Sequence, residues 1–121
     1  MNVLYQPVPE EAVAEVFRTL GQATRIQILL VLGRGEACVC HLEAYLGLRQ
    51  AVISQHLMVL REAGFVATNR DERHIYYYLA QLGLRDVVRQ AARASGLSLQ
   101  SLEESLARPV SPCPCPHCNP G

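Results

Sequence analysis

The stretch from Cys38 to Gly64, CVCHLEAYLGLRQAVISQHLMVLREAG, decides the fold of this chain. It predicts two short helices joined by a tight turn at Gly47, since glycine tolerates the backbone conformation of a sharp reversal. In the second helix, apolar residues recur on one face, at Ile53, Leu57 and Leu60. Two helices around a glycine turn are typical of a helix-turn-helix, whose second helix enters the major groove of DNA.

The residues after Gly64 predict a β-hairpin. FVATNR and IYYYL are rich in β-branched and aromatic residues and flank a polar tip, DERH. The hairpin is expected to help close the core through Phe65, Ile75, Tyr77 and Leu79, and also to form a wing. The expected fold class is therefore mainly α with a small β-hairpin, a winged helix-turn-helix.

These segments in this order resemble the ArsR/SmtB family of metal-sensing winged-helix repressors. The resemblance rests on LGQATRIQILLVL, on the CVC that precedes the SQHL-containing helix, and on the hairpin ending in YYYL. It covers roughly Val13 to Leu79. It implies a homodimer whose interface is built from the first helix and from the helix around Leu84 to Ala91, each of which has one apolar face here.

Length and composition suit one small domain without a membrane span. The 121 residues are enough for one core. Neither a run of about 18 apolar residues nor a secretory leader is present, so a cytoplasmic protein is expected. The formal net charge is zero, so attraction to DNA must come from local charge placement. The sequence contains no Ser-His-Asp order, no glycine-rich phosphate loop and no polar cluster of paired carboxylates. An enzyme is therefore not expected.

The chain divides into a flexible arm (1–8), a winged helix-turn-helix domain with dimerisation helices (9–107) and a Cys/Pro-rich tail (108–121). Pro9 and two glutamates predict the start of the first helix. The segment 23–32 is apolar nearly all round, which predicts the most buried helix. A further short helix is expected over 98–106, with Ser101 and Glu104 spaced as a capping box.

The second helix of the motif carries the residues expected to read DNA. In the family, a serine commonly starts this helix, whereas Arg49 stands here, so a side-chain cap worth about 1 kcal/mol is lost. A guanidinium at this position suits a guanine edge or a phosphate, and glutamines suit adenine. The expected DNA contacts are Arg49, Gln50, Ala51, Val52, Ser54, Gln55, His56 and, in the wing, Arg73.

Two of these residues, His56 and Arg73, are not expected to act as simple base-reading contacts. For His56 we expect a packed or phosphate-bonding role rather than base reading. Beside Arg73, the carboxylates of Asp71 and Glu72 repel phosphate, which argues against a deeply inserted wing.

The five cysteines fall into two clusters, which favours reduced thiols with metal or redox chemistry over a disulfide framework. Cys38 and Cys40 would point about 200° apart on a regular helix, at about 100° per residue. They can converge only if Cys38 lies in the loop or the first helical turn, where the helix dipole favours a thiolate. The alternative is two small buried apolar side chains.

The second cluster, CPCPHC, holds Cys113, Cys115 and Cys118, with His117 beside them. Interleaved prolines keep this segment extended, so clamping an ion costs it little conformational entropy. Three or four thiolates suit soft ions such as trivalent arsenic, cadmium or lead, and also zinc.

In the resembled family, the CVC ligands are completed by a nearby third cysteine or by cysteines from another segment. The arsenic-type third position is Glu43 here, and the zinc-type site needs Asp and His, of which only Asp86 is present. The resemblance therefore implies Cys38 and Cys40 with two of the three tail cysteines, from the same or the opposite protomer.

The expected function is a dimeric repressor that leaves its operator when a soft metal or metalloid binds these thiolates. Two alternatives stay open. One is a thiol redox or persulfide switch on the same scaffold, through a bond between Cys38 or Cys40 and a tail cysteine. The other is an enzyme, for which the sequence offers no catalytic motif. A winged helix that binds only protein would be marked by failure to shift any DNA at low salt.

Overall fold

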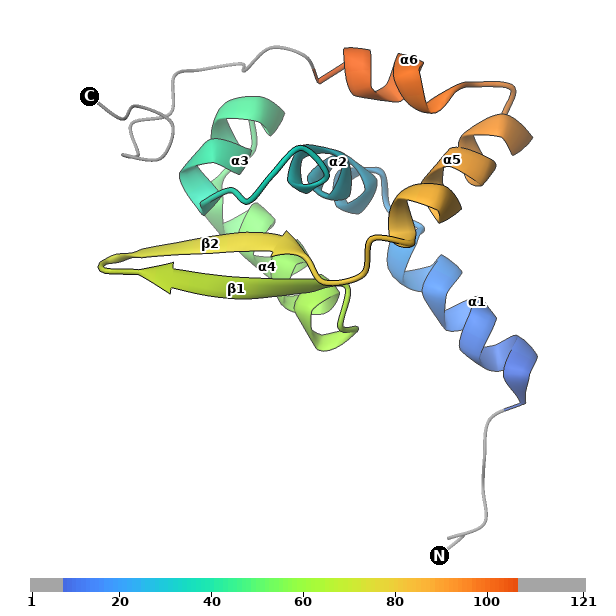
Figure 1. Cartoon of the computed structure of the whole chain (residues 1–121), viewed down its shortest axis with the longest axis horizontal. Coiled ribbons are helices and arrows are strands. Elements are labelled where there is room, and N and C mark those ends of the chain that lie inside the picture. The colour runs from blue at the N-terminus through green and yellow to red at the C-terminus, as the bar shows by residue number, and fades with distance from the viewer. Residues whose placement is uncertain (1–7, 107–121) are drawn as a thin grey trace, which may run out of the picture.

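The structure, a computed structural model, describes residues 8–106. They form six helices and one two-stranded antiparallel sheet (Figure 1). The elements are α1 (Pro9–Leu20), α2 (Ala23–Leu32), α3 (Val39–Leu46), α4 (Gln50–Glu62), β1 (Val66–Asp71), β2 (His74–Leu79), α5 (Leu84–Ala94) and α6 (Leu99–Glu104). None of these helices is long and apolar enough to cross a membrane.

Helix α2 is the centre of the core, as its apolar sequence predicts. Every residue from Ile28 to Leu32 is buried, and α2 contacts the other five helices and β2. Burying one such aliphatic side chain contributes about 1.5–3 kcal/mol. The position of α2 therefore fixes where α1, α5 and the helix-turn-helix can lie.

The helix-turn-helix forms as predicted. Gly47 ends α3 in the left-handed conformation, with φ 67°, which a residue without Cβ adopts at little cost. Helix α4 then buries Ile53, Leu57 and Leu60. The face opposite this stripe is left to solvent, which is the arrangement that a DNA-reading helix requires.

The hairpin pairs β1 and β2 in register, from Val66 opposite Leu79 to Asp71 opposite His74. Its burial differs from the prediction at one position: Ile75 is 40% exposed, because it lies in the next-to-last pair of the sheet, opposite Arg70 and beside the turn. Tyr76 is buried instead, at 4% exposed. The second edge of β2 is also occupied, by backbone hydrogen bonds between Ala37 and Tyr77.

Helices α5 and α6 close the domain. α6 starts after Ser98, whose hydroxyl accepts from the backbone N–H of Ser101, and Ser101 bonds back to Ser98. The predicted capping box at Ser101 and Glu104 is therefore wrong, because the helix begins one turn earlier. The predicted arm, except residue 8, and the tail from residue 107 lie outside the described residues.

Candidate functional site

The predicted reading residues lie on and beside α4. Ile53, Leu57 and Leu60 hold α4 in the core, and the intervening side chains are therefore turned outward. Arg49 is the N-cap residue and makes no side-chain cap bond, so the predicted loss of the cap is confirmed. The exposed members of the predicted set are Arg49, Gln50, Ala51, Val52, Ser54, Gln55 and, between the two strands, Arg73.

His56 differs from its neighbours on α4 because it is half-buried and hydrogen-bonded. The Nε of Arg25, on α2, donates to His56 Nδ1 over 3.2 Å. Burial and the positive charge of Arg25 both lower the pKa of His56 from its ordinary value of 6.5. The packed role predicted for His56 is confirmed, and Arg25 is a partner that sequence spacing did not indicate.

The tip of the wing carries mixed charge. Glu72 and Arg73 connect the strands, and Glu72 adopts a positive φ of 55°. Asp71 is paired with His74 at the end of the sheet, so the turn is tighter than the four-residue tip expected from the sequence. The carboxylates of Asp71 and Glu72 are exposed beside Arg73, where they would repel a DNA phosphate.

The two cysteines of the CVC motif converge. Cys38 is the N-cap of α3, in extended backbone, and the backbone N–H of His41 donates to its Sγ over 3.4 Å. Cys40 lies in the first turn, and the two Sγ atoms are 2.7 Å apart in a thiol hydrogen bond. The expectation that Cys38 must precede the regular helix is confirmed, because only there can both sulfurs meet.

A buried tyrosine covers this thiol pair. Tyr76 of β2 packs with Cys38 and Cys40 in a small apolar cluster separate from the main core. Tyr76 was not predicted to be buried, because the core face of β2 was assigned to Ile75 and Tyr77. The run of three tyrosines was the available signal, since consecutive strand residues point to opposite faces and aromatic side chains therefore stand on both faces of β2.

The described residues contain only part of the predicted set of metal ligands. Within residues 8–106, no group of three or more His, Cys, Asp or Glu side chains is placed to hold an ion. Cys38 and Cys40 are the two predicted ligands that the structure describes. Cys113, Cys115 and Cys118, predicted to complete the set, lie outside the described residues.

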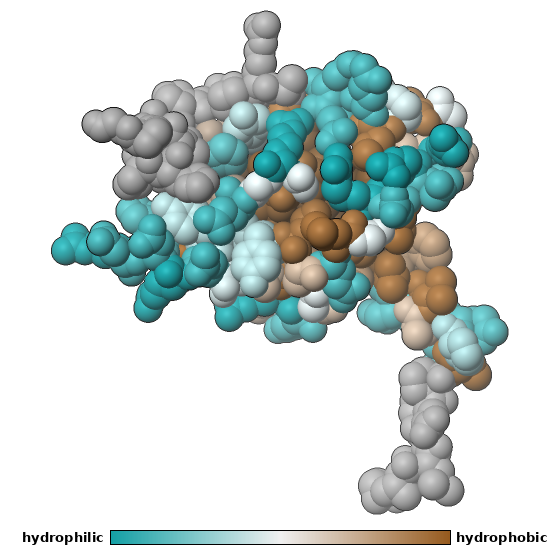
Figure 2. All heavy atoms as spheres, in the orientation of Figure 1, coloured by the Kyte–Doolittle hydropathy of each residue, from teal (hydrophilic) through white to brown (hydrophobic). Residues whose placement is uncertain are grey.

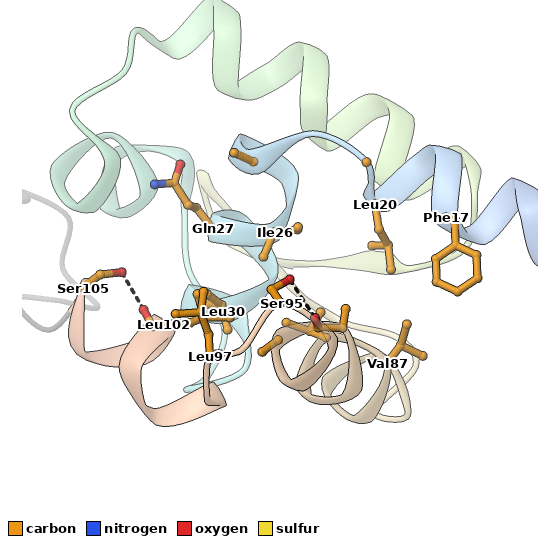
Figure 3. A pocket seen from close by; sticks show the side chains of 15 residues that line it. Phe17, Leu20, Ile26, Gln27, Leu30, Val87, Ser95, Leu97, Leu102 and Ser105 are labelled. Atoms are coloured by element: carbon orange, nitrogen blue, oxygen red, sulfur yellow. Dashed lines mark hydrogen bonds between the residues drawn. The ribbon is translucent and has the colours of Figure 1, made fainter.

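A second feature is an apolar face formed by α1 and α5. Val13 and Phe17 on α1 are 55% and 57% exposed, and Figure 2 shows apolar side chains along this projecting helix. Beside Phe17, a cavity of about 420 Å³ opens between α1, α2, α5 and α6. Figure 3 shows Leu30, Val87 and Leu102 among its lining side chains.

A helix-turn-helix followed directly by a β-hairpin defines the winged-helix class of DNA-binding proteins. Residues 22–68 match the family described as "Bacterial regulatory protein, arsR family". The arsenic resistance transcriptional regulator ArsR1 of Pseudomonas putida is 37% identical over 111 residues, which cover 83% of this chain and 84% of that protein. The chain belongs to the ArsR/SmtB family of transcriptional repressors.

Another relative shares less of its length. The biofilm growth-associated repressor of Agrobacterium fabrum is 45% identical over 69 residues, covering 57% of this chain and 59% of that protein. The chain thus matches less than two thirds of that relative. The likeness to the arsenic regulator extends over most of the chain.

Solved structures agree with the fold. Rv0081 of Mycobacterium tuberculosis has a TM-score of 0.67 and 30% identity, covering 82% of this chain and 97% of that one. The homodimeric winged helix-turn-helix domain Mb0332 of Mycobacterium bovis has a TM-score of 0.57 and 28% identity, with coverage of 78% and 88%. The cadmium sensor CMTR of M. tuberculosis has a TM-score of 0.53 and 36% identity, with coverage of 60% and 74%.

Proposed function

We propose that this repressor is a soft-metal sensor of the cytoplasm that binds operator DNA as a homodimer and is released when arsenite, cadmium or lead binds its thiolates. The observation that carries the proposal is the convergence of Cys38 and Cys40 at the start of α3, with sulfurs 2.7 Å apart. Helix α3 leads through the turn at Gly47 directly into α4. A change at these sulfurs therefore acts on the element that orients the reading helix.

The chemistry of the thiol pair fits a soft ion. Cys38 sits at the positive end of α3, and the N–H of His41 donates to its sulfur, so a thiolate is stabilised there. Thiolates are preferred ligands of soft and borderline metals. Cys38 and Cys40 would supply two of the three or four sulfurs that such an ion needs. The ion would thereby join the start of α3 to the segment that holds the other ligands.

The remaining ligands are proposed to come from two of Cys113, Cys115 and Cys118. The Nη1 and Nη2 atoms of Arg34 donate to the carbonyls of Leu106 and Glu103, each over 2.7 Å, while its guanidinium lies 5.8 Å from the ring of Tyr45 on α3. The last described residues are thereby anchored beside the helix that begins at Cys38.

Chain length permits this closure within one protomer. Tyr45 lies seven residues after Cys38, about 10 Å along a helix. The seven steps from Leu106 to Cys113 span at most about 25 Å. Ligation by the tail of the opposite protomer remains the alternative, and mixed dimers of two variants separate the two arrangements.

The homodimer is proposed from the apolar face of α1 and α5. Phe17 and Val13 stay more than half exposed in the single chain, which is unfavourable for a pair of large apolar side chains on one helix. One recognition helix contacts few base pairs, and two helices at half-site spacing contact twice as many. The proposed DNA contacts are Arg49, Gln50, Ala51, Val52, Ser54, Gln55, His56 and Arg73.

The deciding experiment titrates the reduced apo protein with arsenite, cadmium, lead and zinc. Thiolate-to-metal absorbance and release of a fluorescent operator duplex are followed in the same samples. We expect release to track ligation, with a coupling of about 1–3 kcal/mol. By linkage, saturating operator must weaken ion binding by the same factor, and equal affinity with and without DNA would rule out derepression.

A thiol redox or persulfide switch is the second candidate, because the sulfurs of Cys38 and Cys40 lie close enough together to react at one site. It predicts release by an oxidant or a persulfide donor without any metal. It also predicts no thiolate-to-metal absorbance at inducing doses under reducing conditions. A winged helix that binds only protein would shift no duplex even at low salt.

A further inference from the structure

One arginine of α2 links two other helices. The Nε of Arg25 donates to His56 on α4, and its Nη1 donates to the backbone carbonyl of Thr19 over 3.1 Å. Thr19 is buried in the last turn of α1, and its hydroxyl donates to the carbonyl of Glu15. A single guanidinium therefore ties the end of α1 to the helix that reads DNA.

The bond to His56 fixes where the imidazole carries its proton. Nδ1 accepts from Arg25, so it is unprotonated, and a neutral imidazole must then hold its hydrogen on Nε2. Among residues 8–106, no hydrogen bond occupies that Nε2–H. The lowered pKa of His56 keeps the ring neutral at physiological pH. The exposed Val52 lies one turn before His56, so the ring borders the reading face.

We infer that Arg25 is a positioning residue for operator binding: it holds His56 in the Nε2–H form, so that the ring donates a hydrogen bond to a DNA phosphate. The inference rests on the proposed reading role of α4. A phosphate contact of this kind carries no sequence information and fixes the register of α4 on the duplex. Because Arg25 also bonds Thr19, that register is set relative to the end of α1.

Two substitutions at position 56 test the roles of the two imidazole nitrogens separately. In His56→Asn, the amide oxygen takes the place of Nδ1 and can accept from Arg25, but no donor reaches outward. In His56→Gln, the amide nitrogen takes the place of Nε2, but the acceptor for Arg25 is missing. Arg25→Ala removes the positioning group. Arg18→Ala is the matched control, since within residues 8–106 the Arg18 side chain bonds only Glu15, on the exposed surface of α1.

The first measurement needs no DNA. Nitrogen-15 NMR of the full-length protein is expected to show His56 as the Nε2–H form in wild type and Arg18→Ala, and as a mixture in Arg25→Ala. A mixture of forms in wild type, or an unchanged form in Arg25→Ala, would overturn the inference whatever the protein binds.

The second measurement is affinity for a duplex selected by the wild-type protein from a random-sequence pool. His56→Asn is expected to weaken binding about tenfold, equally for selected and scrambled duplexes. The salt slope should stay unchanged, because a neutral donor releases no counterion. Arg25→Ala is expected to weaken DNA binding in the wild-type background but to cause no further loss of affinity in the His56→Asn background. His56→Gln should retain more affinity than His56→Asn.

The outcomes distinguish this inference from the proposed function. If Arg25 were only a structural tie, His56→Asn would bind DNA as wild type does, and the loss from Arg25→Ala would be equal in both backgrounds. If wild type selects no duplex, operator binding itself fails, while the NMR result still stands. A thermal scan of each variant identifies losses that come from unfolding.

Discussion

A single sulfur atom at the start of α3 has a role in folding and a proposed role in sensing. Side-chain N-caps are usually oxygen, whereas Cys38 caps α3 with sulfur that accepts from His41. The atom that satisfies a helix terminus is thus also the atom proposed to bind the inducer. A ligand on this sulfur competes with the cap, so binding perturbs the beginning of the helix that leads to α4.

Cys38→Ser is expected to separate these two roles. A serine hydroxyl is a better N-cap than a thiol, so the free energy of unfolding should stay the same or rise by about 0.5 kcal/mol. The arsenite and cadmium responses should be lost, because an alcohol is a poor ligand for soft ions. Urea unfolding and operator release measure the two effects, with Cys40→Ser as the matched variant. A retained response in the double serine variant would contradict the thiol site.

The titration of His56 should appear in stability. Its folded pKa is lowered, chiefly by burial and then by Arg25, so the unfolded chain takes up the proton more readily. The contribution of His56 to the free energy of unfolding is fully present above pH 6.5, its ordinary pKa. This contribution is lost as the pH falls below that value toward the lowered pKa of the folded state. Compared with His56→Asn, which cannot titrate, wild type should lose stability between pH 7.5 and 5.5 in urea unfolding. A relative gain would reverse the assigned sign.

At the level of secondary-structure elements, the hairpin also packs against the rest of the domain. β2 pairs with β1 on one edge and with Ala37 on the other, and Tyr76 packs against the thiol pair. The segment just before α3 is thereby held by the same strand that carries the wing. Any displacement of Cys38 or Cys40 is passed to β2 as well as to α3 and α4.

Tyr76→Ala tests this packing. Removing a buried aromatic ring is expected to cost about 3 kcal/mol of unfolding free energy. Tyr78 lies two residues further on the same strand and is 40% exposed, so Tyr78→Ala should cost less than about 1 kcal/mol. Equal losses in denaturant unfolding would show that the thiol cluster does not support the wing.

Helix α1 gives the second prediction at this scale. A charge at Phe17 would be buried without a partner in the proposed dimer, so Phe17→Asp is expected to yield monomers. Operator affinity should fall by at least tenfold, because two half-sites can no longer be bound together. Light scattering after size exclusion measures the mass. Leu82→Asp, at a 75% exposed position outside α1 and α5, is the control that should remain dimeric.

At the scale of the whole molecule, α6 brings the chain back to α3. Arg34 holds the carbonyls at the end of α6, and a salt bridge of 2.9 Å joins Arg85 on α5 to Glu103 on α6. The residues that follow thus begin at a defined place beside the helix-turn-helix. The proposed ligation by the tail depends on this starting point.

A chain truncated after Leu106 should therefore bind operator as the full chain does but require at least tenfold more arsenite or cadmium for release. The full-length variant with serine at Cys113, Cys115 and Cys118 should behave in the same way, which separates the thiols from the tail backbone. Operator anisotropy at increasing inducer concentration gives the dose. Release at the wild-type dose in both variants would remove the tail from the mechanism.

The sequence by itself determined the helices, the hairpin and the convergence of the CVC cysteines, because periodicity, Gly47 and the geometry of a first helical turn are local properties. Only the tertiary structure decided that Tyr76 rather than Ile75 is buried, since burial on β2 depends on where the core ends and on Ala37 at its second edge. It also decided that Arg25 reaches His56, 31 residues away. No spacing rule encodes such a contact, because it exists only once α2 has packed against α4.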